Sequence, residues 1–220
     1  MKRLLQGIAH FHKNVRPGVR ETFAKLALGQ KPDCLFIACS DSRVVPNLFA
    51  SSDPGDLFVI RNPGNIVAPS DESGKSQADE SEAGAIEFAL MHLGVPDIVV
   101  CGHSECAAMR ALCGEMNLEG ADHLQAWLRH AEEALKDRPE ITLDSTQARH
   151  NFVGQMNALV QLDNLRSYPF VAEQERAGKL RLHAWWFDIA NAEVQAYDPG
   201  TKRFHVIDET HAIKLISRLG

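Results

Sequence analysis

The sequence predicts an α/β protein with a mostly parallel central sheet flanked by helices. Short apolar runs of strand length alternate with stretches of helical periodicity over most of the 220 residues. A helical segment precedes the first strand, and a β-hairpin pattern follows the last long strand. We therefore expect a single domain over residues 1–220, with an N-terminal helical arm and an antiparallel C-terminal edge.

The bulk composition excludes several classes of protein. Apolar residues make up 45% of the chain, charged residues 24%, and the net charge is -6. No block of Lys and Arg stands out, so a nucleic-acid partner is not expected. No apolar run approaches the roughly 20 residues that cross a membrane. Five cysteines without a disulfide spacing favour a reducing compartment, so we predict a cytoplasmic protein.

The first helical segment covers residues 4–28. Its apolar positions include Leu5 and Ile8, and Pro17-Gly18 predicts a break before a second helix over 19–28. Because this segment precedes every strand, we expect it to pack on the body of the protein or on a neighbouring subunit.

The core elements follow from apolar runs, helical periodicity and turn residues. In chain order, we predict strand 34–39, helix 46–51, strand 57–60, an extended loop 61–79, helix 80–93, strand 97–101 and helix 104–113 with Ser104 as its N-cap. These are followed by helices near 121–136, 145–164 and 168–177, with Pro139 between the first two, then by strand 180–189 and a hairpin with strands 194–197 and 204–207.

Chemistry-bearing residues follow two of these strands. Cys39 ends the first strand, and His103 and Cys106 come just after the third. If the first strand lies between the second and third, the ends of the first and third strands flank a topological switch point, where open α/β sheets bind ligands. The sequence has no Gly-x-Gly-x-x-Gly and no Walker loop, so a nucleotide is not the expected ligand.

Two thiols and one imidazole are the donor set of a catalytic zinc site, with one position left for a carboxylate or water. We predict Cys39, His103 and Cys106 as the ligands. His103 and Cys106 form a His-x-x-Cys spacing at the expected start of a helix, which places both donors on one turn. The alternative is that these are ordinary buried cysteines, but two motifs at two strand ends favour a metal. The three remaining cysteines are assigned to core packing: Cys34, Cys101 and Cys113.

Asp41 and Arg43 lie on the turn after Cys39, and we predict an ion-paired dyad. Asp41 either coordinates the metal or accepts a hydrogen bond from a metal-bound water; the alternative is a surface ion pair of little consequence. Glu105 is a candidate general base, or more simply an acid in the first turn of a helix. The other histidines share no spacing, so they are assigned to the surface or to packing.

These residues closely resemble the β-class carbonic anhydrases. The matching segments are Cys39–Arg43, Pro54–Asn62 with Gly64-Asn65, Ile86-Glu87, Cys101–Cys106, Leu182–Trp185 and Asp188-Ile189. The similarity covers most of residues 1–205 and is nearest to the bacterial subgroup associated with cyanate breakdown.

The resemblance implies the β-carbonic anhydrase fold, one Zn²⁺ per subunit and the reversible hydration of CO2 to bicarbonate and a proton by zinc-bound hydroxide. Asp41 and Arg43 would orient the zinc water. Family members are usually homodimers or multiples of dimers, with the N-terminal helices embracing the partner. The substrate-binding positions implied are Gln30, often across the dimer interface, Phe58, Phe88 and the Gly102 amide. The plainer alternatives are core packing for Phe58 and Phe88 and a loop-end polar residue for Gln30.

The chain departs from the family pattern at several positions. Ala107 stands where the family usually has glycine, and Phe88 stands where many members have tyrosine. Pro63 stands where a small residue is common, and Ala184 stands where the family has glycine. A bicarbonate-inhibited subtype has Trp where this chain has Phe36, so we expect water on zinc and Asp41 paired to Arg43. Two alternatives stay open. The substrate is a CO2 analogue such as carbon disulfide, or the zinc site is structural and Asp41 permanently occupies its fourth coordination position.

Overall fold

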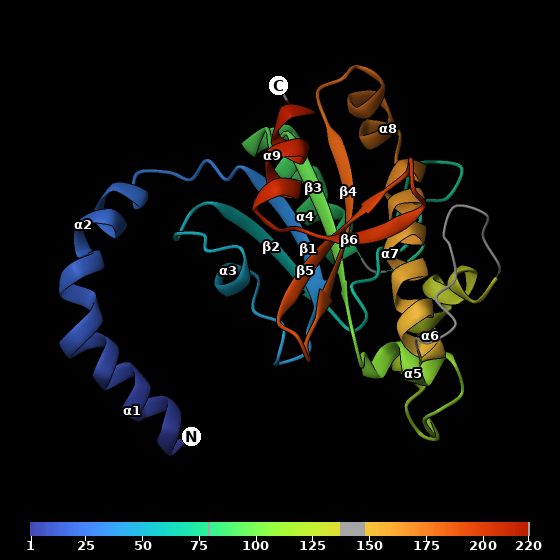
Figure 1. Ribbon diagram of the computed structural model, residues 1–220, viewed down its shortest axis with the longest axis horizontal. Coiled ribbons are helices and arrows are strands. Elements are labelled where there is room, and N and C mark those ends of the chain that lie inside the picture. Colours follow the sequence, from blue (N-terminus) through green and yellow to red (C-terminus); the bar gives the residue numbers. More distant parts are fainter. Residues whose placement is uncertain (79, 137–147, 220) are drawn as a thin grey trace.

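The computed structural model describes residues 1–78, 80–136 and 148–219, and its centre is a six-stranded sheet (Figure 1). The strand order is β2-β1-β3-β4-β5-β6. The strands are β1 Cys34–Cys39, β2 Leu57–Asn62, β3 Asp97–His103, β4 Arg181–Asp188, β5 Glu193–Asp198 and β6 Arg203–Val206. β2, β1, β3 and β4 run parallel, whereas β5 and β6 are antiparallel. The predicted fold class and the C-terminal hairpin are therefore confirmed.

Strand β1 lies between β2 and β3, as the switch-point argument requires. Cys39 is in register with Asn62 of β2, and Ala38 is in register with Cys101 of β3. Because the three strands are parallel, their carboxyl ends meet at one edge of the sheet. Both predicted motifs therefore lie at the same edge.

Helices cover the two faces of the sheet unequally. The larger core lies on one face, where the aliphatic side chains of β1 and β3 pack against helices. These helices are α4 Glu80–Phe88 with the π-helical turn Ala89–Leu93, α5 Ala107–Leu112, α6 Asp122–Leu128 with the 3-10 helix Arg129–Leu135, α7 Arg149–Ser167 and α8 Pro169–Arg176. The other face carries a smaller cluster around Phe36 and Phe187, closed by Phe49 of α3 (Pro46–Phe49).

Helix α7 packs closely on the sheet beside the predicted site. Gly154 faces the buried ring of Trp186 and lies next to Gly102 of β3. Two fully buried polar residues of α7 bind the loop after β2: the Asn157 side chain donates to the Gly64 carbonyl at 2.9 Å, and Gln161 accepts from the Val67 amide at 2.8 Å. Because buried polar groups need partners, these bonds fix the loop that passes Cys39.

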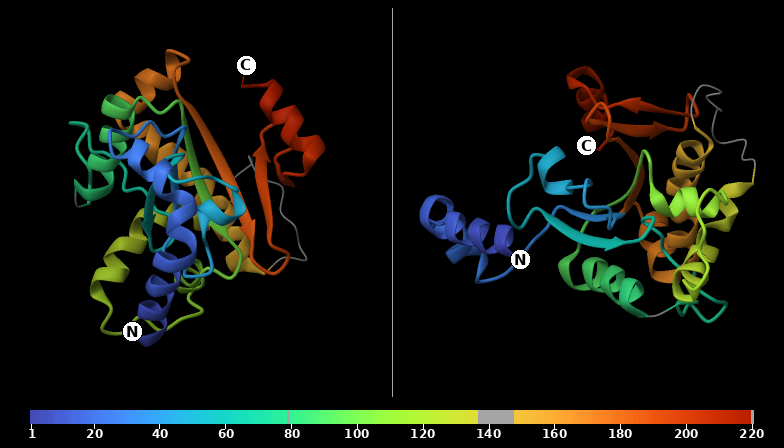
Figure 2. Two further views of the ribbon diagram at one scale, coloured as in Figure 1. Left: turned by 90° about the vertical axis from the view of Figure 1, so that its left-hand side faces the viewer. Right: turned by 90° about the horizontal axis from the view of Figure 1, so that it is seen from below.

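The N-terminal arm stands clear of the sheet (Figures 1 and 2). It comprises α1 Lys2–His10, a π-helical stretch Phe11–Val15 and α2 Arg16–Leu26. The predicted break at Pro17-Gly18 is wrong, because the chain stays helical from Lys2 to Leu26, and the π-helical stretch Phe11–Val15 joins α1 to α2 just before Pro17. Apolar side chains of the arm are exposed, including Leu4, Leu5 and Ile8.

The structure differs from the expected elements at the start of one helix and in one additional helix. Helix α5 begins at Ala107, not Ser104, because β3 continues to His103 and a turn follows it. Helix α9 (Glu209–Ser217) was not predicted, although Asp208 caps it by accepting a hydrogen bond from the His211 amide.

Pro139 lies outside the described residues. Across the part of the chain that the structure describes, no helix is long and apolar enough to span a membrane.

Candidate metal centre

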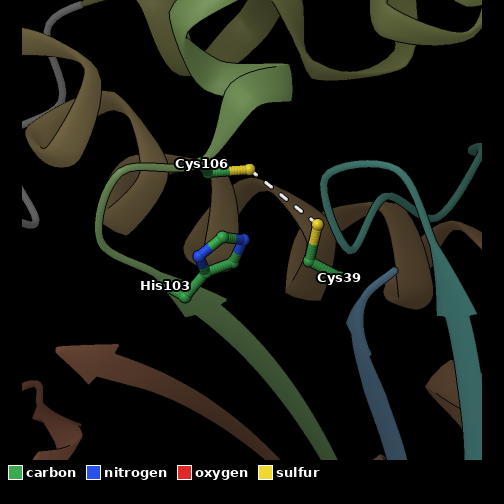
Figure 3. A group of neighbouring side chains, drawn as sticks. All are labelled: Cys39, His103 and Cys106. Carbon is green, nitrogen blue, oxygen red and sulfur yellow. Dashed lines mark hydrogen bonds between the residues drawn. The ribbon is translucent and has the colours of Figure 1, made fainter. Parts of the chain in front are cut away.

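The three predicted ligands meet at the carboxyl edge of the sheet (Figure 3). Cys39 is the last residue of β1, His103 is the last residue of β3, and Cys106 is the N-cap of α5. Their donor atoms all lie within 4.8 Å of one another, and all three residues are buried. The structure therefore brings together two thiols and an imidazole that are up to 67 residues apart in sequence.

The spacing of the donor atoms fits a tetrahedral zinc ion. The two Sγ atoms are 3.9 Å apart, and two Zn–S bonds of about 2.3 Å at a tetrahedral angle place sulfur atoms about 3.8 Å apart. His103 Nδ1 lies 2.9 Å from the Ser104 carbonyl. That contact assigns the ring proton to Nδ1 and leaves the lone pair on Nε2, which is the arrangement of a metal-bound histidine.

His103 Nε2 is buried and has no hydrogen-bond partner. A buried polar atom without a partner costs free energy unless a ligand satisfies it. Since thiolate and imidazole are the donors that zinc prefers, the residues present fit the ion that the sequence predicts.

The surroundings of the trio favour a thiolate. The hydrogen bond with Cys106 outweighs burial and, together with His103 and the Gly64 amide, lowers the pKa of Cys39 below that of an ordinary thiol. The Gly64 N–H donates to Cys39 Sγ at 3.3 Å. The bond with Cys39 and burial raise the pKa of Cys106. One proton therefore leaves the pair readily, whereas loss of the second requires a cation nearby.

Asp41 and Arg43 form the predicted pair. Arg43 donates from Nε and Nη2 to the two carboxylate oxygens at 2.9 and 2.7 Å, and its backbone N–H adds a third bond at 2.9 Å. The side-chain bond from Arg43, against an opposing effect of burial, holds the pKa of Asp41 far below its usual range. Asp41 is thus an ionised hydrogen-bond acceptor beside the trio. It does not belong to the group of candidate metal ligands, which is Cys39, His103 and Cys106.

The side chain of Arg61 holds the same turn by binding backbone carbonyl groups of the turn. It donates from Nε and Nη2 to the Cys39 carbonyl at 3.0 and 2.8 Å, and from Nη2 to the Asp41 carbonyl at 2.7 Å. A planar guanidinium that binds the carbonyl groups of two residues, with one residue between them, restricts the path of the chain across that turn. The direction of the Cys39 side chain and the position of Asp41 are therefore fixed together.

Glu105 occupies a left-handed turn between His103 and Cys106, with φ of 56°. This conformation costs a residue other than glycine about 1–2 kcal/mol. The prediction of an acid in the first helical turn is wrong, since α5 begins two residues later. The carboxylate instead contacts His150 at 3.2 Å and accepts from Asn151 at 3.0 Å. The bond from His150, the largest influence, lowers the pKa of Glu105.

The predicted substrate residues divide into two groups. Gly102 lies in β3 beside His103, with its Cα facing Trp186 and α7. Gln30 is exposed before β1, at the opposite end of that strand from Cys39. Phe58 of β2 is in register with Leu35, four residues before Cys39, and its ring lies 6.0 Å from that of Phe88. Gln30 and Phe58 therefore lie away from the trio along β1 and β2 within one chain.

The other cysteines are separate from the site. All five are free thiols. Cys34 and Cys101 lie in β1 and β3, where burial raises the pKa of both thiols, that of Cys34 to about 12. Cys113 follows α5 and is half-buried.

Comparison with known proteins gives a consistent result. Residues 34–194 match the family model described as carbonic anhydrase. The chain is 38% identical over 216 residues to a carbonic anhydrase of Pseudomonas aeruginosa, covering 98% of this chain and 96% of that protein. It is similar to the solved structure of the β-carbonic anhydrase CcaA, with 37% identity, a TM-score of 0.83 and coverage of 94% and 98%. Tetrameric β-carbonic anhydrases of Sordaria macrospora are 30% identical, with a TM-score of 0.65 and coverage of 89% and 92%.

Proposed function

Because the chain belongs to the β-class carbonic anhydrase family, we propose that it is a zinc enzyme that interconverts CO2 with bicarbonate and a proton, with Cys39, His103 and Cys106 as the zinc ligands. The observation that carries the proposal is the trio itself. Its sulfur atoms have the separation of a tetrahedral zinc site, and its imidazole presents an unpaired buried nitrogen. When bound there, zinc supplies Lewis-acid chemistry that lowers the pKa of water towards about 7.

The residues around the trio account for the rest of the chemistry. Asp41 is kept ionised and held by Arg43, so it serves as the acceptor that orients the reacting water. Arg43 also opposes closure of Asp41 onto the ligands, because that movement would break three hydrogen bonds from one residue. These contacts favour an open catalytic site over a structural site with four protein ligands.

The position of Gln30 and Phe58 supports a pocket shared between subunits. Strand β1 spans about 17 Å from Cys34 to Cys39 at 3.3 Å per residue, and Gln30 lies a further four residues before it. If Gln30 binds substrate, it therefore does so in the site of a neighbouring subunit, and we place Phe58 and its neighbour Phe88 in the same shared pocket. The Gly102 amide is the substrate-binding group that we assign to the same chain as the trio.

We accordingly propose a homodimer or a multiple of dimers. The arm carries exposed apolar side chains, Leu4 and Leu5 at 66% and 59% and Ile8 at 64%, which a partner would cover. Deleting residues 1–28 should yield monomers with little CO2 hydration activity even when zinc is bound. Sedimentation and zinc content measured on the same sample would check this. A monomer with full activity would contradict the shared pocket.

Two narrower assignments are part of the proposal. Five free thiols, two of them predicted metal ligands, favour the reducing cytoplasm. Membership of the subgroup associated with cyanate breakdown rests on the sequence resemblance alone.

The ligand assignment is tested by paired cysteine variants. Cys106→Ser should lose zinc and CO2 hydration together, because a hydroxyl replaces a thiolate ligand. Cys113→Ser is the matched control: Cys113 lies only seven residues later and outside the trio, so this variant should keep both properties. Equal zinc content and activity in the two variants would contradict the assignment.

A further inference from the structure

Glu105 connects the metal-ligand turn to two other parts of the chain. Its left-handed backbone is unusual for a residue other than glycine, and each of its polar groups is engaged. Its N–H donates to Asn151 Oδ1 at 2.7 Å, and its carboxylate accepts from Asn151 Nδ2 at 3.0 Å. A single side chain at the start of α7 therefore holds both the backbone and the side chain of Glu105.

The carbonyl of Glu105 binds the opposite side of the site. It accepts a hydrogen bond from Arg43 Nη2 at 3.0 Å, and the same Nη2 donates to Asp41 Oδ2 at 2.7 Å. The hydrogen bonds thus run without interruption from Asn151 through Glu105 and Arg43 to Asp41. A rotation of the Glu105 peptide would move the carbonyl that Arg43 binds, and it would also turn the next residue, Cys106.

We propose that Asn151 is a positioning residue for the metal site: it fixes Glu105 and thereby sets the direction of Cys106 and the place of Arg43. This inference rests on the proposed function, since it concerns the geometry of the zinc ligands and of the dyad beside them. No local motif in the sequence marks Asn151, which is 46 residues from Glu105. The ring of His150 lies between Glu105 and Glu115 and supports the same turn.

Three variants of the full chain test the role of Asn151. Asn151→Ala removes both bonds to Glu105. Combining Asn151→Asp with Glu105→Gln restores them in part, because the Asp oxygen still accepts from the backbone N–H and the Gln amide donates to the carboxylate. Gln155→Ala is the control. Gln155 lies one turn further along α7, is half-buried, and makes no side-chain hydrogen bond among the described residues.

Two readouts report on the ligands directly: zinc affinity from competition with a chelator, and the visible absorption spectrum of the Co²⁺-substituted protein. Asn151→Ala should weaken zinc binding about 10-fold and change the Co²⁺ spectrum. The double variant should recover both, and Gln155→Ala should match the wild type. Circular dichroism should show the same helix content in all four proteins.

The inference is overturned if Asn151→Ala keeps the wild-type affinity and spectrum, if Gln155→Ala loses as much affinity, or if the double variant recovers nothing. A wild-type protein that binds neither Zn²⁺ nor Co²⁺ would overturn the proposed function itself and this inference with it. The two failures are therefore distinguishable by the wild-type measurement.

Discussion

The close packing of α7 on the sheet predicts that Gly154→Ala destabilises the protein. A Cβ at this position would lie 2.8 and 2.9 Å from ring atoms of Trp186, about 0.6 Å short of an ordinary contact of 3.4 Å. Trp186 is 2% exposed, so its ring has no solvent to move into. Helix α7 must therefore shift away from β3 and β4.

The cost follows from two opposing effects. Overpacking a close-packed core costs about 1–3 kcal/mol. Replacing glycine within a helix by alanine gains about 1 kcal/mol. Gly84→Ala in α4 is the matched control, because the new Cβ meets no atom within 4 Å and only the gain remains. Since the gain is common to both variants, their free energies of unfolding should differ by about 1–3 kcal/mol.

Urea unfolding of both variants, at one protein and zinc concentration, measures this difference. Gly84→Ala should be slightly more stable than the wild type, and Gly154→Ala less stable than Gly84→Ala. Gly154→Ala should also bind zinc more weakly, because α7 carries Asn157, which binds the loop beside Cys39. Equal stabilisation by the two substitutions would refute the close approach of α7 to Trp186.

Two further predictions concern buried and paired groups. Tyr168→Phe removes the 2.7 Å hydrogen bond that Tyr168 Oη donates to the buried Ala68 carbonyl. The free energy of unfolding in urea should therefore fall by about 1–3 kcal/mol, and an unchanged unfolding midpoint would contradict this. Burial opposes ionisation of Asp97, but hydrogen bonds from Arg181 and His183 outweigh it and lower its pKa. That stabilisation is present above the ordinary Asp pKa of about 3.9 and is lost as the pH falls through the lowered value. The stability difference between wild type and Asp97→Asn should therefore shrink below about pH 4, and a constant difference from pH 7 to pH 3 would contradict it.

Much of the fold and the meeting of Cys39, His103 and Cys106 could be predicted from local sequence signals. The apolar runs of β1 and β3 are short and bounded by turn residues, and Cys39 and His103 stand at their ends. Parallel strands bring such ends together, so the trio followed from topology. Asp41 and Arg43 are two residues apart, and their pairing needed no long-range contact.

The remaining features depend on tertiary contacts that sequence spacing does not report. Ser104 as an N-cap predicts Glu105 in the first turn of a helix, but β3 continues to His103 and a tight turn follows it. Asn151 holds that turn from a distant helix. Pro17-Gly18 predicts a helix break, but the π-helical stretch Phe11–Val15 keeps the chain helical into α2. Helix α9 does carry a local signal, because Asp208 at its N-cap accepts a hydrogen bond from the His211 amide.

The most direct test of the central claim is stopped-flow CO2 hydration by the wild-type protein across pH 6–9, roughly spanning the ionisation of water on zinc, with zinc content determined on the same sample. We expect about one zinc per chain and activity that rises with pH through a single ionisation. A protein that contains zinc but hydrates no CO2 anywhere in this range would contradict it. That result would make the trio of Cys39, His103 and Cys106 a structural site.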